Sequence, residues 1–230
     1  MEQDMPDQIR AQEVEGQFVE IGAGLLTYDM LSEMPASELD GTPVRYHVAV
    51  DLGIETNPNK ARENDTDYWA MAVVAEEAKP PNTDAYLMAV RRRRGQAPSA
   101  AAEWIRQEIE SLNIPTRTVR YESVQAQSWF ESDLKDHGLK PVPIEPKASK
   151  DDRIIGLSVP FSNGQVSLID WRGTPYDMDW SNFRREWAAF PDGSHDDQLD
   201  AVSMALDPVD FGTRLPGLSG DMYARGDKDE

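Results

Sequence analysis

The sequence predicts an α/β fold with a mixed sheet flanked by helices. Three apolar segments come first, separated by polar stretches, and this order favours an antiparallel meander of three strands. Extended segments then alternate with stretches of helical periodicity, which is typical of parallel strands joined by helices. The chain has 230 residues, enough to bury a sizeable core, so we expect one domain with extensions.

The strands of the meander are expected at 46–52, 68–75 and 85–90. The first, Tyr-His-Val-Ala-Val-Asp-Leu, is a short apolar run with an acid near its end, which suits a buried strand. A polar loop over 53–67 separates it from the second strand. Pro80-Pro81-Asn82 favours a turn between the second and third strands.

The rest of the chain alternates between helical and extended patterns. Ile105 and Ile109 repeat at helical spacing, and Asn163-Gly164 predicts a turn before a strand. We expect helices at 99–112, 123–137, 149–157, 179–190 and 195–206, and extended segments at 116–122, 141–144 and 165–169. The tryptophans of these helices are interpreted as core residues: Trp104, Trp129 and Trp187.

The composition restricts the chemistry that the chain can carry. There is no cysteine, which excludes disulfides, thiolate metal sites and cysteine catalysis, and only three histidines are present. A bound metal would therefore have oxygen ligands, which favours magnesium or manganese over zinc. The chain has no apolar run of about 18 residues and no signal-peptide pattern, so we expect no membrane span.

The charge balance is strongly acidic. Forty-two Asp and Glu residues against 23 Lys and Arg give a formal net charge of −19, and only seven of the bases are lysine. An acidic, lysine-poor chain with ordinary hydrophobic content is typical of proteins from concentrated salt, so we predict a halophilic protein. At about 1 M salt the Debye length is about 3 Å, so distant acids would not prevent binding to DNA.

The most informative segment is Phe190-Pro-Asp-Gly-Ser-His-Asp-Asp-Gln-Leu-Asp-Ala201. It places Asp196, Asp197 and Asp200 in the first turns of a predicted helix whose other face is apolar. Crowded carboxylates resist ionising together, and a divalent cation would remove that cost. The alternative is helix capping, with Ser194 as N-cap and the acids complementing the helix dipole.

Two predicted strands also end in acids, Asp51 and Glu122. Open α/β sheets carry functional residues beyond the carboxyl ends of their strands. If these strands are neighbours and the late helix crosses them, Asp51, Glu122 and Asp197 converge, with Asp196 or Asp200 in support. Such a set could bridge two cations about 4 Å apart and hydrolyse a phosphodiester. Taken singly, Asp51 could be a turn residue and Glu122 a helix N-terminal acid.

The ordered set resembles the ribonuclease H-like nuclease domain of viral large terminase subunits. The similarity covers about 44–206 and rests on the two strand-end acids and on the His195-Asp-Asp-Gln-Leu-Asp-Ala201 run. Arg185-Glu-Trp-Ala-Ala-Phe-Pro191 and Pro146-Lys-Ala-Ser-Lys-Asp-Asp-Arg153 also match segments of that family. Residues 1–43 resemble the junction after the packaging ATPase, and 207–230 are expected to form a flexible acidic tail.

The resemblance implies a two-metal endonuclease that cuts concatemeric double-stranded viral DNA during genome packaging. It implies Asp51, Glu122 and Asp197 as catalytic residues and two Mg²⁺ or Mn²⁺ ions as cofactors. Asp51 would bridge the ions, Glu122 would hold the second and Asp197 the first. Asp196 could exchange with Asp197, whereas His195 is expected to be a structural cap. The secondary acids are Asp67 and Asp200.

Basic residues near these acids are candidate DNA contacts. A run of four arginines follows the third strand, and three further bases lie in the segment before the strand at 165–169. They could hold phosphates without reading base sequence. The alternative for the arginine run is a solvated strand end. The candidates are Arg91, Arg92, Arg93, Arg94, Lys147, Lys150 and Arg153.

The chain has no phosphate loop of the Gly-x-x-x-x-Gly-Lys-Ser/Thr type, and Gly22-Ala-Gly24 does not replace one. We therefore expect a separately encoded packaging ATPase, or a truncated or remnant gene. The expected partners are double-stranded DNA, that ATPase, the portal and the small terminase subunit, in the host cytoplasm. The alternatives are a Holliday-junction-resolvase-like nuclease and a non-catalytic packaging-assembly module.

Overall fold

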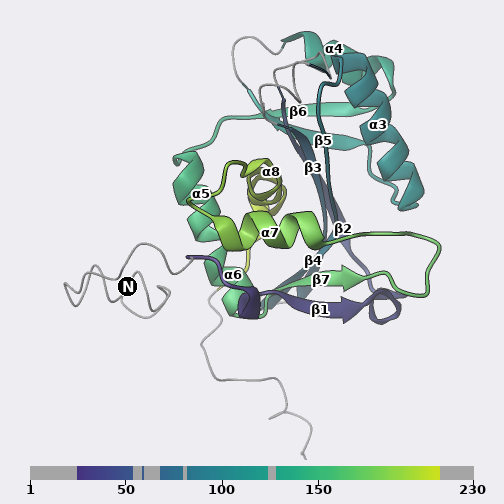
Figure 1. Cartoon of the computed structure of the whole chain (residues 1–230). Coiled ribbons are helices and arrows are strands. Elements are labelled where there is room, and N and C mark those ends of the chain that lie inside the picture. Colours follow the sequence, from purple (N-terminus) through teal and green to yellow (C-terminus); the bar gives the residue numbers. More distant parts are fainter. Residues whose placement is uncertain (1–24, 54–58, 60–67, 80–81, 124–127, 213–230) are drawn as a thin grey trace, which may run out of the picture.

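A computed structural model of the chain describes residues 25–53, 59, 68–79, 82–123 and 128–212. Its centre is a seven-stranded sheet in the order β1-β7-β4-β3-β2-β5-β6 (Figure 1). The strands are β1 Ser32–Pro35, β2 Arg45–Asp51, β3 Trp69–Lys79, β4 Asn82–Arg93, β5 Thr118–Glu122, β6 Lys140–Ile144 and β7 Val166–Asp170.

The sheet confirms the predicted mixture of antiparallel and parallel strands. Strands β2, β3 and β4 form the antiparallel meander, whereas β5, β6, β7 and β1 each pair in parallel. Strands β3 and β4 run further than the sequence indicates, and β4 takes in Arg91, Arg92 and Arg93. Pro80 and Pro81 of the expected turn, and most of the 53–67 loop, lie outside the described residues.

Helices cover both faces of the sheet. Figure 1 shows α3 and α4 on one face and α5, α6, α7 and α8 on the other. The helices are α3 Pro98–Ser111, α4 Ser128–Asp136, α5 Lys150–Gly156, α6 Ser158–Ser162, α7 Ser181–Ala189 and α8 Asp197–Leu206, with short 3-10 turns η1 Tyr28–Met30 and η2 Ala36–Leu39. All five expected helices are present, although 124–127 of the helix expected over 123–137 lie outside the described residues. The sequence does not predict the short α6.

The sheet extends further towards the N-terminus than the family resemblance indicates. Strand β1 pairs in parallel with β7, with Ser32 opposite Ser167, and it forms one edge of the sheet. Leu26 and Leu31 are buried in the core beneath α7 and α8. Residues 25–43, expected as part of a leader ahead of residue 44, therefore contribute to the same sheet and core.

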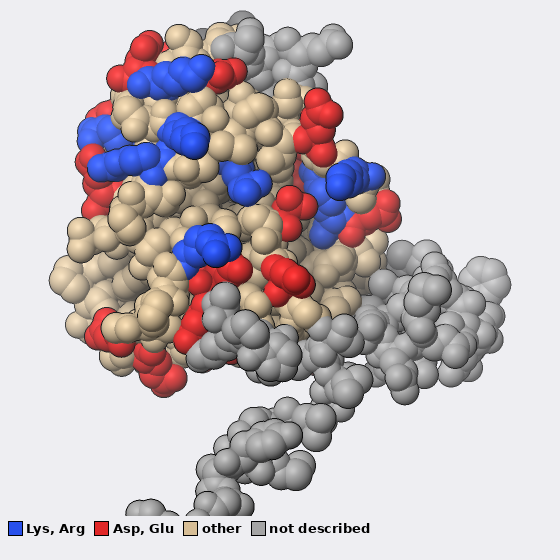
Figure 2. Space-filling model, turned by 180° about the vertical axis from the view of Figure 1, so that it is seen from behind, with Lys and Arg blue, Asp and Glu red and all other residues tan. Residues whose placement is uncertain are grey.

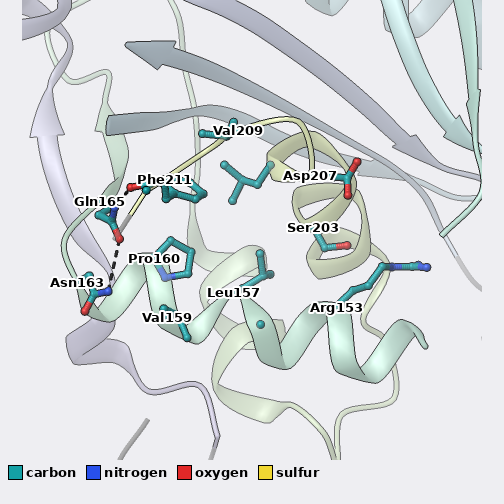
Figure 3. A pocket seen from close by; sticks show the side chains of 13 residues that line it. Arg153, Leu157, Val159, Pro160, Asn163, Gln165, Ser203, Asp207, Val209 and Phe211 are labelled. Carbon is teal, nitrogen blue, oxygen red and sulfur yellow. Dashed lines mark hydrogen bonds between the residues drawn. The ribbon is translucent and has the colours of Figure 1, made fainter. Parts of the chain in front are cut away.

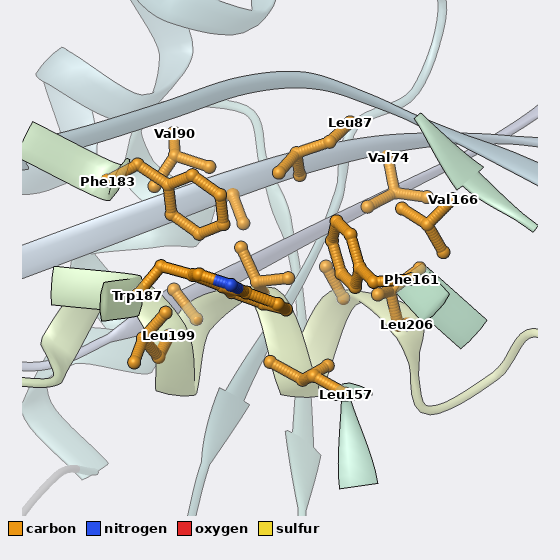
Figure 4. Packing of buried hydrophobic residues seen from close by; sticks show 14 of the residues in the cluster. Val74, Leu87, Val90, Leu157, Phe161, Val166, Phe183, Trp187, Leu199 and Leu206 are labelled. Atoms are coloured by element: carbon orange, nitrogen blue, oxygen red, sulfur yellow. The ribbon is translucent and has the colours of Figure 1, made fainter. Parts of the chain in front are cut away.

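The core on the α8 side is built around aromatic side chains (Figure 4). Trp187 is fully buried, and its ring centroid lies 4.6 Å from that of Phe161 and 5.8 Å from that of Phe183. Its indole N–H donates to the Thr27 carbonyl at 2.9 Å. Every residue of α8 from Asp197 to Leu206 is buried, so this helix is an internal element that packs on β2 and β3.

The core assignment of the tryptophans is correct for two of the three. Trp104 and Trp187 are buried, whereas Trp129 exposes 42% of its surface. Trp129 is near the start of α4, where it packs edge-on against Trp69 and Phe130. Helical spacing places Trp129 beside the core, but the adjacent Phe130 takes the buried position.

Gly53, two residues beyond the end of β2, is packed too closely to accept a side chain. A Cβ atom there would lie 2.8 Å from Trp69 Cδ1 and 2.9 Å from the Trp69 backbone nitrogen. We expect Gly53→Ala to lower the free energy of unfolding by about 1–3 kcal/mol, as overpacking does. Gly156→Ala is the control, because no atom outside its chain neighbours and the backbone of its own helix lies within 4 Å of its Cβ position. Chemical denaturation should show loss only for Gly53→Ala; equal stability of both variants would contradict this packing.

Candidate active site

Two of the predicted acids lie side by side at one edge of the sheet. Asp51 is the last residue of β2 and Glu122 is the last residue of β5. These strands are parallel neighbours, with Val50 opposite Tyr121, so the acids that follow lie at the same level. The carboxyl ends of the two strands therefore meet as the sequence analysis expects.

Helix α8 brings the other acids to this edge because its first turn packs over β2. Asp197 and Asp200 are each 2% exposed, and the Asp196 side chain is 33% exposed. Burial raises the pKa of Asp51, and the charges of Asp200 and Asp197 raise it further. We call Asp51, Glu122, Asp196, Asp197 and Asp200 the acid cluster.

Lys150, the first residue of α5, joins three members of the acid cluster. Its Nζ atom lies 2.8 Å from Asp196 Oδ1, 3.7 Å from Asp51 Oδ2 and 3.8 Å from Asp200 Oδ2. Lys150 is predicted to contact DNA, and the structure places its ammonium among the carboxylates.

Arg153, one turn along α5, joins the remaining strand-end acid to α8. Its guanidinium donates to Glu122 Oε2 at 3.0 Å and to Asp200 Oδ1 at 2.7 Å. Asp200 thus contacts both cations of α5. Arg153 also stands at one end of a pocket of about 410 Å³ between α5, α6 and the end of α8 (Figure 3).

Burial and charge together set the protonation of this cluster. Burial raises the pKa of Asp51 to about 8, Lys150 opposes the rise, and the charges of Asp200 and Asp197 add to it. Burial disfavours the charge on Lys150, but the carboxylates of Asp51 and Asp196 outweigh it and raise the pKa of the ammonium above its usual range. The cluster is therefore an environment that strongly favours added positive charge.

The donor chemistry of the acid cluster fits a hard divalent cation, because every candidate ligand is a carboxylate oxygen. Three of these carboxylates already surround one positive charge, that of Lys150. Across the residues that the structure describes, no group of three or more His, Asp or Glu side chains is arranged to hold a metal ion. In this conformation the cations of α5 stand between the carboxylates.

Ser194 is not the N-cap of α8, whereas Asp197 and Asp200 do lie in its first turn, where acids complement the helix dipole. The helix begins at Asp197, with Asp196 at the N-cap, and the Asp196 side chain makes no capping hydrogen bond. Neither Ser194 nor His195 is the cap residue. His195 instead lies against Arg94, which directly follows β4: its Nε2 is 2.7 Å from the Arg94 guanidinium, and its Nδ1 is 3.8 Å from Asp197 Oδ2.

The four arginines separate to the two faces of the sheet, because successive residues of a strand point in opposite directions. Arg92 and Arg94 lie on the α8 side, with their guanidinium carbons 4.1 Å and 4.0 Å from the Tyr68 ring centroid. Arg91 and Arg93 lie on the α3 side, where Arg93 is exposed and stands over the Trp104 ring.

The basic side chains do not form one continuous patch on the face seen in Figure 2. There, Lys and Arg side chains lie among Asp and Glu side chains. Of the predicted DNA contacts, Arg93 and Lys147 are exposed, whereas Arg91, Arg92, Arg94, Lys150 and Arg153 are half-buried. Asp67, the other predicted secondary acid, lies outside the described residues.

Glu186 lies near the site and is not among the site residues predicted from the sequence. It is buried on α7 with 6% exposure, forms an ion pair with Arg92, and its Oε2 accepts the backbone N–H of Gln198 at 2.9 Å. Burial raises the pKa of Glu186 to about 7, against the opposing effects of Arg92 and the Gln198 amide. The only sequence signal was its place a few residues before Phe190-Pro191.

Solved structures place this architecture among large terminase nuclease domains. The nuclease of the thermophilic phage G20c with bound zinc is 20% identical, with a TM-score of 0.51 over 78% of this chain and 94% of that one. The phage P22 nuclease domain is 13% identical, with a TM-score of 0.52 over 79% and 89%. A manganese-soaked, inhibitor-bound human cytomegalovirus terminase nuclease domain is 11% identical, with a TM-score of 0.56 over 81% and 95%.

The chain therefore has the ribonuclease H-like fold of the viral large terminase nuclease domains, and the resemblance predicted from the sequence is confirmed at the level of the fold. No protein-family model and no curated protein sequence matches the chain. The phage G20c domain has also been solved with bound cobalt and with bound magnesium. No helix in the described segments is both long and apolar enough to cross a membrane.

The raised pKa of Asp51 predicts a pH-dependent stability when divalent metal is removed. Between the ordinary pKa of 3.8 and the folded value of about 8, the folded protein holds a proton that the unfolded chain has released. Stability therefore falls as pH rises through this window, and the loss is complete above about pH 8. Asp51→Asn, which stays neutral, should lose less stability.

Thermal unfolding in EDTA at about pH 6 and about pH 9 measures this difference, because the two conditions lie on either side of the folded pKa. Asp136→Asn, an exposed carboxylate on α4, is the control and should follow the wild type. The same loss for wild type and Asp51→Asn would show that Asp51 does not take up this proton.

Proposed function

We propose that this chain is a metal-dependent endonuclease that cleaves concatemeric double-stranded viral DNA during genome packaging. The observation that carries the proposal is the acid cluster, in which carboxylates from β2, β5 and α8 meet around shared positive charge. The shared fold supports it, because domains of the same architecture include large terminase nucleases with bound divalent metals.

Two Mg²⁺ or Mn²⁺ ions are the proposed cofactors. Asp51 would contribute to both ion sites, Glu122 to one and Asp197 to the other, with Asp196 and Asp200 as further ligands. Bound there, divalent cations would polarise the scissile phosphate and lower the pKa of an attacking water. Asp51 and Glu122 are suited to this because each ends a strand of the rigid sheet.

The cations of α5 have a second task in this proposal. Lys150 and Arg153 offset the repulsion among the carboxylates, which are otherwise costly to keep ionised when buried. A phosphate entering the site would offer these two side chains alternative partners of the same charge. They would then hold the DNA backbone at the acid cluster, in line with their assignment as DNA contacts.

The setting of the enzyme is also part of the proposal. The expected partners are a separately encoded packaging ATPase, the portal and the small terminase subunit, in the cytoplasm of a host cell. The acidic, lysine-poor composition supports a halophilic host, because such surfaces suit concentrated salt. We retain residues 44–206 as the proposed extent of the family resemblance. Within the proposed tail, 207–230, Val209 and Phe211 pack on the core, so the first described residues of that segment belong to the folded domain.

Loss of single carboxylates tests the endonuclease. We expect wild type to nick and linearise plasmid DNA with Mn²⁺ in molar potassium chloride. Asp51→Asn and Asp197→Asn should each reduce the rate at least 100-fold, since each removes a charged ligand from the site. Asp136→Asn, an exposed acid on α4, is the matched control and should cleave like wild type. Chelation with EDTA should stop all cleavage.

Two other outcomes would replace the proposal. Preferential cutting of four-way junctions over linear duplex would indicate a Holliday-junction-resolvase-like enzyme. No cleavage by folded wild type with any divalent metal, at low or high salt, would instead favour a non-catalytic packaging-assembly module.

The exposed bases give a separate prediction about DNA binding. In EDTA, Arg93→Ala and Lys147→Ala should each weaken duplex binding and lower the slope of log affinity against log salt by about one unit, as expected for one lost phosphate contact. Fluorescence anisotropy over a series of salt concentrations measures both quantities. Arg106→Ala is the control, because Arg106 is engaged by Glu103 and Glu110 on α3. A slope unchanged by both test variants would remove Arg93 and Lys147 from the interface.

A further inference from the structure

Glu186 is a buried acid that lies behind the acid cluster. It is 6% exposed on α7, and its partners come from two other elements. Arg92 of β4, with a side chain 15% exposed, forms an ion pair with Glu186 Oε1. The backbone N–H of Gln198, in the first turn of α8, donates to Glu186 Oε2 at 2.9 Å. One carboxylate thus connects α7, β4 and α8.

The contact with Gln198 matters because of where it falls in α8. The first N–H groups of a helix have no partners within that helix. At α8 the N-cap residue, Asp196, makes no side-chain capping bond. Glu186 supplies a capping acceptor from another helix, at the residue that directly follows Asp197. The position of the first turn is therefore fixed by tertiary contacts.

Arg92 is itself held from several directions. Its guanidinium lies 4.1 Å from the Tyr68 ring centroid, and it donates to Asn182 Oδ1 at 3.3 Å. Arg92 and Asp51 belong to the same sheet, so the Glu186 carboxylate is held by the sheet that carries Asp51. The start of α8 and the end of β2 therefore keep a fixed relative position.

We propose that Glu186, with Arg92, is a positioning residue for the candidate metal site, since it fixes the first turn of α8 so that Asp197 and Asp200 face Asp51. This inference rests on the proposed function. The Glu186 side chain pairs with Arg92 and accepts the backbone N–H of Gln198, so it acts through the backbone that carries Asp197 and Asp200.

The chain provides a matched control for a buried glutamate. Glu76 of β3 is also 6% exposed and is paired with His47 at 2.7 Å. Ala70, which lies opposite Asp51, is six residues away along the same strand. At about 3.3 Å per residue, Glu76 is roughly 20 Å from the acid edge. Glu76→Gln perturbs a buried pair of the same kind, far from the site.

The experiment compares Glu186→Gln with Glu76→Gln in the full chain. Isothermal titration with Mn²⁺ and the Mn²⁺-dependent rise in unfolding temperature over EDTA are measured for both and for wild type. We expect Glu186→Gln to weaken Mn²⁺ binding about 10-fold or more, as loss of a residue that orients metal ligands does. The rise in its unfolding temperature caused by Mn²⁺ should be correspondingly smaller. Glu76→Gln should keep the wild-type Mn²⁺ affinity and the wild-type rise in unfolding temperature, even if its unfolding temperature in EDTA is lower.

Wild-type Mn²⁺ affinity in Glu186→Gln would overturn the positioning role, whatever its stability in EDTA. Absence of Mn²⁺ binding by wild type would overturn the proposed metal site itself, so the two failures are distinguishable. If Glu186→Gln does not fold, Arg92→Lys replaces it. That variant keeps the positive charge but loses the guanidinium geometry. A reduced Mn²⁺ affinity of Arg92→Lys would support the positioning role, and an unchanged Mn²⁺ affinity would overturn it.

Discussion

Positive charge placed among carboxylates is the constraint on which this site depends. Five acids from β2, β5 and α8 meet at one edge of the sheet, and such crowding opposes their ionisation. The compensation comes from one short helix, α5, whose Lys150 and Arg153 contact four of them between 2.7 and 3.8 Å. Ser149 caps this helix by accepting the Asp152 N–H, which fixes its start next to Lys150.

A second set of charged side chains, the four arginines 91–94, lies behind the acid cluster, and the alternation of side chains along a strand determines where each arginine points. Because side chains alternate along β4, the arginine run divides into two pairs. Arg92 and Arg94 meet Glu186 and His195 on the α8 side, whereas Arg91 and Arg93 lie over Tyr176 and Trp104 on the other. A run that looks like one basic patch in sequence thus supports two different packing layers.

Much of this arrangement could be predicted from the sequence because it depends on strand ends and helix starts. Asp51 and Glu122 follow apolar runs, and Asp197 opens a helix, so their meeting follows from the order of elements. Strand β1 and helix α6 could not be predicted, since the four residues of β1 show no apolar alternation and the five residues of α6 are fewer than two helical turns. The contacts of Lys150 with Asp51 and Asp196 join residues distant in sequence, and local pattern carries no such information.

The exposed Trp129 gives the molecule an internal optical reporter. Its indole meets solvent while resting on fully buried Trp69, whose neighbour Ala70 lies opposite Asp51. Indole emission shifts with hydration, so this pair provides two chromophores in contrasting surroundings a few residues from the same sheet edge. Rearrangement of that edge would shift the wavelength of tryptophan emission, so no attached label is needed to detect it.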